Sequence, residues 1–219
     1  AYDIARCYNG GGLLIAGPPG SGKTTVLRDL IRQLSGGMCK KNYRVAVIDS
    51  RGEISGSAGG TAQNDLGACS DVLLCADKAL GIEIALRTLY PDIIAFDEIG
   101  RQEELKQVSE SLNAGVDIIT TAHIGGLDDI MRRSVTAELI QSGAVKWVAV
   151  LPKIHGGTVK LLGAAELLMR PFERFSESPA YMCFQTLIWG AGYFAIFCGL
   201  ADRGKKTCNY PISFGRSAQ

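Results

Sequence analysis

A run of glycines ending in Lys-Thr has the composition of a loop that binds phosphate. The pattern G-x-x-x-x-G-K-[ST] is matched by Gly17, Pro18, Pro19, Gly20, Ser21, Gly22, Lys23 and Thr24, with Thr25 directly after it. Glycines let successive N–H groups converge on phosphate oxygens at a helix N-terminus. In that arrangement Lys23 contacts the β- and γ-phosphates and Thr24 offers its hydroxyl to Mg²⁺, which predicts ATP and Mg²⁺ as ligands of these nine residues.

The segments on either side of this loop supply the context that the motif requires. Residues 12–16 are an apolar run typical of a buried strand. The helix expected over 23–34 has one apolar face, formed by Leu27, Leu30, Ile31 and Leu34. An ordinary glycine-rich turn is the alternative, and this strand–loop–helix order argues against it.

Two adjacent acids follow another apolar run at 92–96. Open α/β sheets place their ligands at the carboxyl ends of strands, where Asp97 and Glu98 are expected. Because side chains alternate along a strand, the two acids should have different roles: Asp97 holds Mg²⁺ or its water, and Glu98 orients and deprotonates the attacking water. The alternative is a solvated acidic strand end.

Further polar residues end the neighbouring strands. Glu53, close to Asp49 after the second strand, is either a metal, water or γ-phosphate contact or part of a surface turn. His123 closes the fourth strand and is predicted to sense the γ-phosphate, although a lone histidine is more often structural. A charge-stabilising arginine is sought among several candidates, with Arg101 favoured over Arg51, Arg87, Arg132 and Arg133. Each arginine has the alternative of a solvated or salt-bridged side chain.

Apolar runs alternate with segments of helical period, which predicts an α/β fold with a mostly parallel sheet flanked by helices. The expected strands are residues 12–16, 44–48, 92–96, 116–120 and 146–151, and the expected helices are 23–34, 76–89, 102–113 and 127–141. Residues 50–70 are interrupted by glycines, which predicts a long and functional loop. Residues 154–158 have the composition of a hairpin turn.

Composition limits the classes of function. The 219 residues carry 23 basic and 22 acidic side chains, so overall charge does not favour a nucleic-acid partner. Seven cysteines without a CxxC pair and two histidines argue against zinc and predict reduced cytosolic thiols. We expect one main domain over 1–168, in a fragment that lacks an N-terminal region.

The remaining residues, 169–219, form a predicted tail. Residues 180–201 carry no Asp, Glu, Lys or Arg, a length sufficient to cross a bilayer as a helix. Arg203, Lys205 and Lys206 would then lie on the far side, against the positive-inside tendency. Three interpretations stay open: a helix that spans or lies on the membrane, a buried or partner-docking helix, and a non-native extension.

The order of five motifs resembles the stage III sporulation protein AA ATPases, relatives of the type II and type IV secretion and pilus-motor ATPases. These motifs are GPPGSGKTT, VAVIDSRGEISG, AQNDLG, PDIIAFDEIGR and NAGVDIITTAH, within about residues 10–165. The resemblance assigns Lys23 and Thr24 to Walker A, Asp97 and Glu98 to Walker B, Glu53 to an acidic box and His123 to a histidine box. Cys69 stands where an arginine is expected, which puts one contact between subunits in doubt.

The resemblance implies a RecA-like ASCE ATPase that assembles as a homo-oligomeric, hexameric ring. Its expected role is to power a secretion-like channel between mother cell and forespore, together with membrane-embedded channel components. It is expected in the cytoplasm, peripheral to or anchored at the membrane. Two other functions are weighed against this one: a nucleic-acid-binding P-loop ATPase and a nucleotide-dependent scaffold without turnover.

Overall fold

The chain folds around one twisted sheet in the computed structural model, which describes residues 2–38, 41–57, 61–153 and 158–168. In these residues the sheet has seven strands in the order β3-β2-β4-β5-β1-β6-β7. All neighbouring pairs are parallel except β6 and β7, which are antiparallel. The strands are β1 (Leu13–Gly17), β2 (Val45–Ile48), β3 (Ser70–Leu73), β4 (Ile93–Phe96), β5 (Asp117–His123), β6 (Trp147–Val150) and β7 (Lys160–Gly163).

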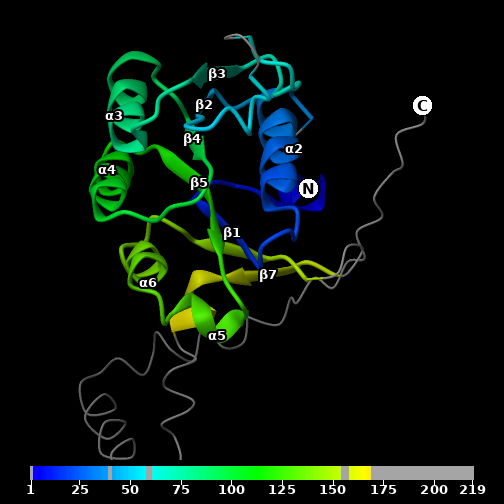
Figure 1. Ribbon diagram of the computed structural model, residues 1–219, viewed down its shortest axis with the longest axis vertical. Helices are drawn as coiled ribbons and strands as arrows, with labels where there is room; N and C mark the ends of the chain where they lie inside the picture. Colours follow the sequence, from blue (N-terminus) through cyan, green and yellow to red (C-terminus); the bar gives the residue numbers. More distant parts are fainter. Residues whose placement is uncertain (1, 39–40, 58–60, 154–157, 169–219) are drawn as a thin grey trace, which may run out of the picture.

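Helices cover both faces of this sheet (Figure 1). They are α1 (Tyr2–Cys7), α2 (Lys23–Ser35), α3 (Lys78–Thr88), α4 (Gln102–Asn113), α5 (Leu127–Ile130) and α6 (Ser134–Gln141). Figure 1 shows α2 on one side, and α3, α4 and α6 on the other. Strands β1, β2 and β4 are buried along their whole length, because both of their faces are covered by helices.

The two faces of β1 belong to two separate apolar cores. Leu13 and Ile15 pack with α1 and α2, whereas Leu14 and Ala16 pack with residues of α3, α4 and α6. This alternation follows from the period of two along a strand. The predicted α/β class, with a mostly parallel sheet between helical layers, is confirmed.

The strand order brings three strand ends together. Because β5 lies between β4 and β1, it pairs Thr120 with Phe96 on one side and His123 with Gly17 on the other. The phosphate-loop motif after β1, the acids after β4 and the last residues of β5 therefore share the carboxyl edge of the sheet. This is the edge at which the sequence predicted a ligand.

Some elements differ from those predicted. Strand β3 was not predicted because Ser70 and Asp71 lack apolar alternation, as an edge strand allows. The helix predicted over 127–141 is wrong: it is two helices, since Arg132 N bonds to Asp129 O in a three-residue turn and the Thr136 hydroxyl donates to the Ile130 carbonyl. Helix α1 was also not predicted.

The antiparallel β6–β7 pair agrees with the predicted hairpin, although residues 154–157 of its turn lie outside the described ranges. The same is true of the predicted tail, 169–219, including the apolar segment 180–201. Among the helices of the described residues, none combines the length and apolar character needed to cross a membrane.

Candidate functional site

The phosphate-loop motif forms the turn between β1 and α2. Gly20 and Gly22 have φ of +74° and +85°, conformations that glycine adopts without steric cost, and no atom would obstruct a Cβ at either position. Gly22 is the N-cap of α2 and provides no side chain to bond the first helical N–H groups. The loop therefore presents main-chain donors at the positive end of a helix dipole, as an anion site requires.

Lys23 is buried within this loop, with 5% of its surface exposed. Its ammonium group donates to the Pro18 carbonyl at 2.9 Å and lies 3.0 Å from Nδ1 of His123. Burial lowers the pKa of Lys23 from its ordinary value, against the opposing effect of the nearby Asp97 and Glu98 carboxylates. A buried cation that bonds a carbonyl and an imidazole, and no carboxylate among the described residues, is suited to an incoming anion.

The Asp97 carboxylate is fixed by one hydroxyl on each side. Thr24 Oγ1 donates to Asp97 Oδ2 at 3.0 Å, and the Thr121 hydroxyl donates to Oδ1. The two donors come from the first turn of α2 and from β5. The structure thus joins the phosphate loop to the acidic strand end through one carboxylate.

Glu98 projects to a different set of partners. Its Oε1 lies 3.9 Å from Nε2 of His123, and its Oε2 lies 4.0 Å from an Nη atom of Arg51. The side chains of Glu98 and His123 are 40% and 39% exposed. Both have room to reach a substrate in front of the loop.

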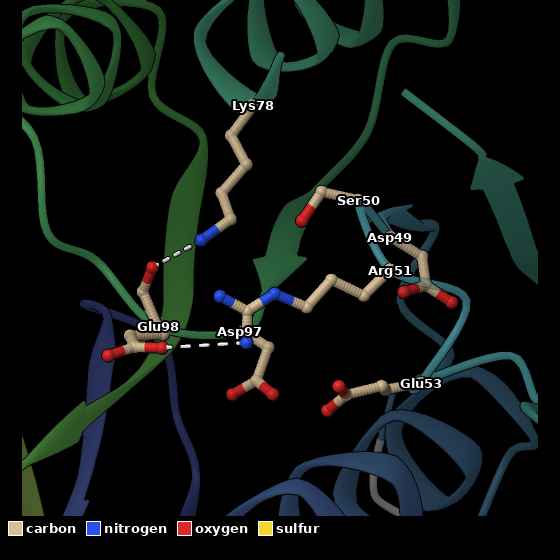
Figure 2. Close-up of a pocket in the computed structure, with 7 residues that line it drawn as sticks. All are labelled: Asp49, Ser50, Arg51, Glu53, Lys78, Asp97 and Glu98. Carbon is tan, nitrogen blue, oxygen red and sulfur yellow. Dashed lines mark hydrogen bonds and ion pairs between the residues drawn. The ribbon is translucent and has the colours of Figure 1, made fainter. Parts of the chain in front are cut away.

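A small pocket lies beside the acidic pair and is shown in Figure 2. It is lined by Asp49, Ser50, Arg51, Glu53, Lys78, Asp97 and Glu98. Figure 2 shows the Arg51 side chain extending across it toward Glu98, with Lys78 entering from the other side. Four acids and two bases give the lining a net negative charge, which suits a site that also receives cations.

The two acids that follow β2 differ in their surroundings. Asp49 is buried and accepts bonds from the amide and the hydroxyl of Ser55, so it holds the start of the long loop in place. Glu53 is exposed and lines the pocket, and its carbonyl accepts a bond from Arg28 of α2 at 3.0 Å. Both line the pocket, and Glu53 is the one whose side chain is exposed.

The arginine candidates are scattered. Arg101 is exposed at the N-cap of α4 and is not part of the pocket lining. Arg87 and Arg133 form helical ion pairs with Glu83 and Asp129 at 2.8 and 3.2 Å. Among the arginines that the structure describes, Arg51 is the one at the pocket.

Lys78 and Ser50 are the pocket residues that the sequence interpretation missed, and Lys78 is the charged one. It begins α3 after the N-cap Asp77, and its ammonium group donates to the Glu98 carbonyl. Its only signal in the sequence is a lysine in the first turn of a helix, where the helix dipole disfavours a positive charge. That signal does not identify the residue that compensates the charge.

A phosphate loop after β1, an acidic pair after β4 and an additional strand between them define a RecA-like P-loop NTPase fold of the ASCE type. The chain belongs to the family described as sporulation stage III, protein AA, whose model matches residues 4–164. It is 39% identical over 150 residues to stage III sporulation protein AA of Bacillus subtilis (strain 168), covering 67% of this chain and 48% of that protein. It thus spans about half the length of this relative.

Another relative comes from a plant. Over 128 residues the chain is 32% identical to the protein SEEDLING PLASTID DEVELOPMENT 1 of Arabidopsis thaliana, covering 56% of this chain and 18% of that protein. The matched region is thus less than a fifth of that plant protein.

Solved structures of two ATPases and a pilus retraction motor share the fold. The Legionella pneumophila ATPase DotB aligns with a TM-score of 0.55 at 17% identity, covering 92% of this chain and 59% of that one. The pilus retraction motor PilT, solved with bound ADP, gives a TM-score of 0.53 at 19% identity, with 94% and 61% covered. The Brucella suis VirB11 ATPase of a type IV secretion system, solved with sulphate, gives 0.52 at 16% identity, with 76% and 51% covered.

Proposed function

We propose that this protein is an ATP-hydrolysing motor subunit that energises a secretion-like transport channel during endospore formation, between mother cell and forespore. Membership of the sporulation stage III, protein AA family supports the cellular process. The fold shared with secretion and pilus-motor ATPases supports the use of ATP for transport. The observation that carries the proposal is the bond between Thr24 and Asp97, which couples the phosphate loop to the acidic strand end.

The phosphate loop is proposed to bind the triphosphate. Gly20, Ser21 and Gly22 would supply main-chain N–H groups, since Pro18 and Pro19 carry none. Thr24 and Thr25 would add those of the first turn of α2. The buried Ser21 hydroxyl has no hydrogen-bond partner in the described part of the chain, which fits an anion in the cradle. Lys23 would neutralise the β- and γ-phosphate charge.

The residues present also fit Mg²⁺. This ion prefers oxygen ligands and keeps several waters, so one hydroxyl and one carboxylate beside a phosphate suffice. Thr24 and Asp97 supply that hydroxyl and that carboxylate. Bound there, the ion would neutralise phosphate charge that develops during transfer.

Hydrolysis requires a group that orients and deprotonates water. Glu98 is proposed for this role. Asp97 bonds the hydroxyl of Thr24, whereas the carboxylate of Glu98 faces His123 beside the loop. His123 would report the state of the γ-phosphate, since it contacts Lys23 and faces Glu98. Glu53 would hold water or metal at the pocket, and Arg101 would act from a neighbouring subunit.

The active assembly is proposed to be a homo-oligomer, a hexameric ring on the cytoplasmic side of a membrane that docks on membrane-embedded components of the sporulation channel. This placement is supported by two proteins of the same fold. VirB11 is named as the ATPase of a type IV secretion system, and PilT is named as a pilus retraction motor. Contact of residues 180–201 with the membrane remains a prediction.

The decisive experiment measures Mg-ATP turnover of the full-length gene product as a function of protein concentration. Specific activity should rise steeply with concentration if subunits complete each other's sites. Glu98→Gln should retain ATP and lose turnover, and Lys23→Ala should lose ATP binding. Unchanged ATP affinity in Lys23→Ala would refute the proposal, and normal spore formation with Glu98→Gln would indicate a scaffold instead.

A further inference from the structure

Glu98 has an unusual backbone conformation. Its φ is +48°, and Tyr90 is the other non-glycine residue with positive φ in the described chain. Residues with a Cβ adopt this left-handed backbone region at an energetic cost, and they keep it only where the surroundings impose it. The strain therefore needs a structural cause next to Glu98.

Two contacts hold the main chain of Glu98. Its amide donates to Thr121 Oγ1 at 2.9 Å, and its carbonyl accepts a bond from the ammonium group of Lys78. Thr121 belongs to β5 and Lys78 to α3, so Glu98 is clamped from both sides. Figure 2 shows the Lys78 side chain descending from α3 to this carbonyl.

Lys78 is itself held in an unfavourable place. It occupies the first turn of α3, where the Asp77 carboxylate caps the N–H groups of Ala79 and Leu80. A positive charge is disfavoured at this end of a helix, and the side chain is only 15% exposed. The buried Glu104 carboxylate, 3.9 Å away, compensates the charge of Lys78.

We propose that Lys78 is a positioning residue that keeps Glu98 in its left-handed conformation, with its carboxylate directed at the substrate side of the phosphate loop. The inference rests on the proposed hydrolysis and adds a residue to it. Lys78 acts on the carbonyl of Glu98, while the carboxylate stays near His123 and Arg51. Without Lys78, the backbone relaxes to negative φ and the carboxylate turns away from its target.

A competing role for Lys78 is direct binding of phosphate, as a second cation in the pocket. The two roles predict different kinetics. A positioning residue changes kcat with little effect on ATP affinity, whereas a phosphate ligand changes affinity. A positioning residue also loses its effect once Glu98 no longer functions as a base, because residues that act as one unit are not additive.

The experiment compares Lys78→Met, the control Lys106→Met on the exposed surface of α4, and the double variant Lys78→Met/Glu98→Gln. Lys78→Met should lower kcat by about a hundredfold, the lower end of general-base contributions, with the ATP Kd changed less than about twofold. Lys106→Met should match the wild type. In the Glu98→Gln background, Lys78→Met should cause no further loss of single-turnover rate.

Hydrogen exchange gives a readout independent of activity. The Glu98 amide should exchange faster in Lys78→Met than in the wild type, because its bond to Thr121 depends on the clamped conformation. Lys78→Arg, which keeps a cation and N–H donors, should retain most of the protection and the turnover. Lys78→Leu, which also lacks an N–H donor, replaces Lys78→Met with the same expectations if the latter does not fold.

Three results would overturn the inference: wild-type exchange at Glu98 in Lys78→Met, an ATP Kd that rises as much as kcat falls, or equal losses in the wild-type and Glu98→Gln backgrounds. A wild-type protein without turnover would instead refute the proposed hydrolysis. The exchange measurement would still decide whether Lys78 positions Glu98.

Discussion

Lys23 of the phosphate loop and His123 of β5 are in direct contact, with Nζ and Nδ1 3.0 Å apart. An ammonium group donates and never accepts, so Nδ1 is the acceptor and the imidazole proton is on Nε2. That nitrogen faces Oε1 of Glu98 at 3.9 Å. Lys23, His123 and Glu98 therefore form a continuous polar chain from the loop to the acidic strand end.

The first prediction concerns this polar chain of Lys23, His123 and Glu98. His123→Asn keeps an acceptor where Nδ1 lies but loses the Nε2–H group that faces Glu98. His123→Ala loses both. If His123 couples the nucleotide to the base, kcat should fall by about a hundredfold or more in both variants, the lower end of general-base contributions.

ATP affinity separates the two variants. His123→Asn should bind ATP like the wild type, because Lys23 keeps its partner, and His123→Ala should differ in Kd. Steady-state kinetics and nucleotide titration measure both quantities. Wild-type kcat in His123→Asn would show that the contact between His123 Nε2 and Glu98 does not contribute to turnover.

The second prediction is that Lys23 destabilises the nucleotide-free protein. Burial lowers its pKa, so the folded state binds the lysine proton less tightly than the unfolded state does. Removing the buried charge in Lys23→Met should therefore leave the Tm unchanged or raise it, while ATP no longer shifts it.

The pH dependence of this effect has a fixed sign. The destabilisation is complete below the folded pKa and disappears as the pH rises through it toward the ordinary lysine value of 10.5. The Tm difference between Lys23→Met and the wild type should thus shrink at alkaline pH. A Tm clearly below that of the wild type at neutral pH would contradict the prediction.

The third prediction separates the two acids. Asp97 accepts bonds from Thr24 and Thr121, whereas Glu98 has no contact with Thr24 among the hydrogen bonds of the described residues. Asp97→Asn should remove the dependence of ATP affinity on Mg²⁺. The ATP affinity in the presence of Mg²⁺ should fall by about tenfold or more, because one charged ligand is lost. Glu98→Gln is the matched control and should keep that dependence. Titrations with Mg²⁺ and with EDTA provide the measurement, and equal behaviour of the two variants would refute the division of roles.

The sequence predicted the parts of the site that depend on local pattern. The loop at 17–24 and the acids after 93–96 follow from glycine spacing and apolar runs, and the parallel sheet places them at one edge. The contact between Lys23 and His123 was not predictable as a distance, because it depends on β5 lying between β4 and β1. Strand order is a property of the whole chain rather than of any segment.

Lys78 shows why the remaining residues were missed. Its partner atom is the carbonyl of Glu98, and every residue carries a carbonyl, so residue types contain no signal for the bond. The division of 127–141 into α5 and α6 has a similar origin, since it depends on the hydroxyl of Thr136 meeting the Ile130 carbonyl. In both places the deciding bond runs from a side chain to a backbone carbonyl, which apolar periodicity does not encode.

The last prediction tests how the long loop is anchored. Gly67, near its end, has φ of +85°, and a Cβ there would meet Ser35 Oγ as well as the Arg32 carbonyl oxygen at 2.8 Å. Ser35 donates its hydroxyl to the carbonyl of Leu66, which is buried against α2. Gly67→Ala therefore forces the loop away from the C-terminal end of α2.

Gly115 is the matched control, because it has φ of +74° and open space where an added methyl group would lie. Gly115→Ala should cost only the left-handed penalty of about 1–2 kcal/mol, and Gly67→Ala should cost about 1–3 kcal/mol more through overpacking. Urea unfolding measures both free energies. Equal destabilisation would show that the loop yields freely at Gly67, and that its path toward Asp49 and the pocket is fixed by the bonds of Asp49 to Ser55 instead.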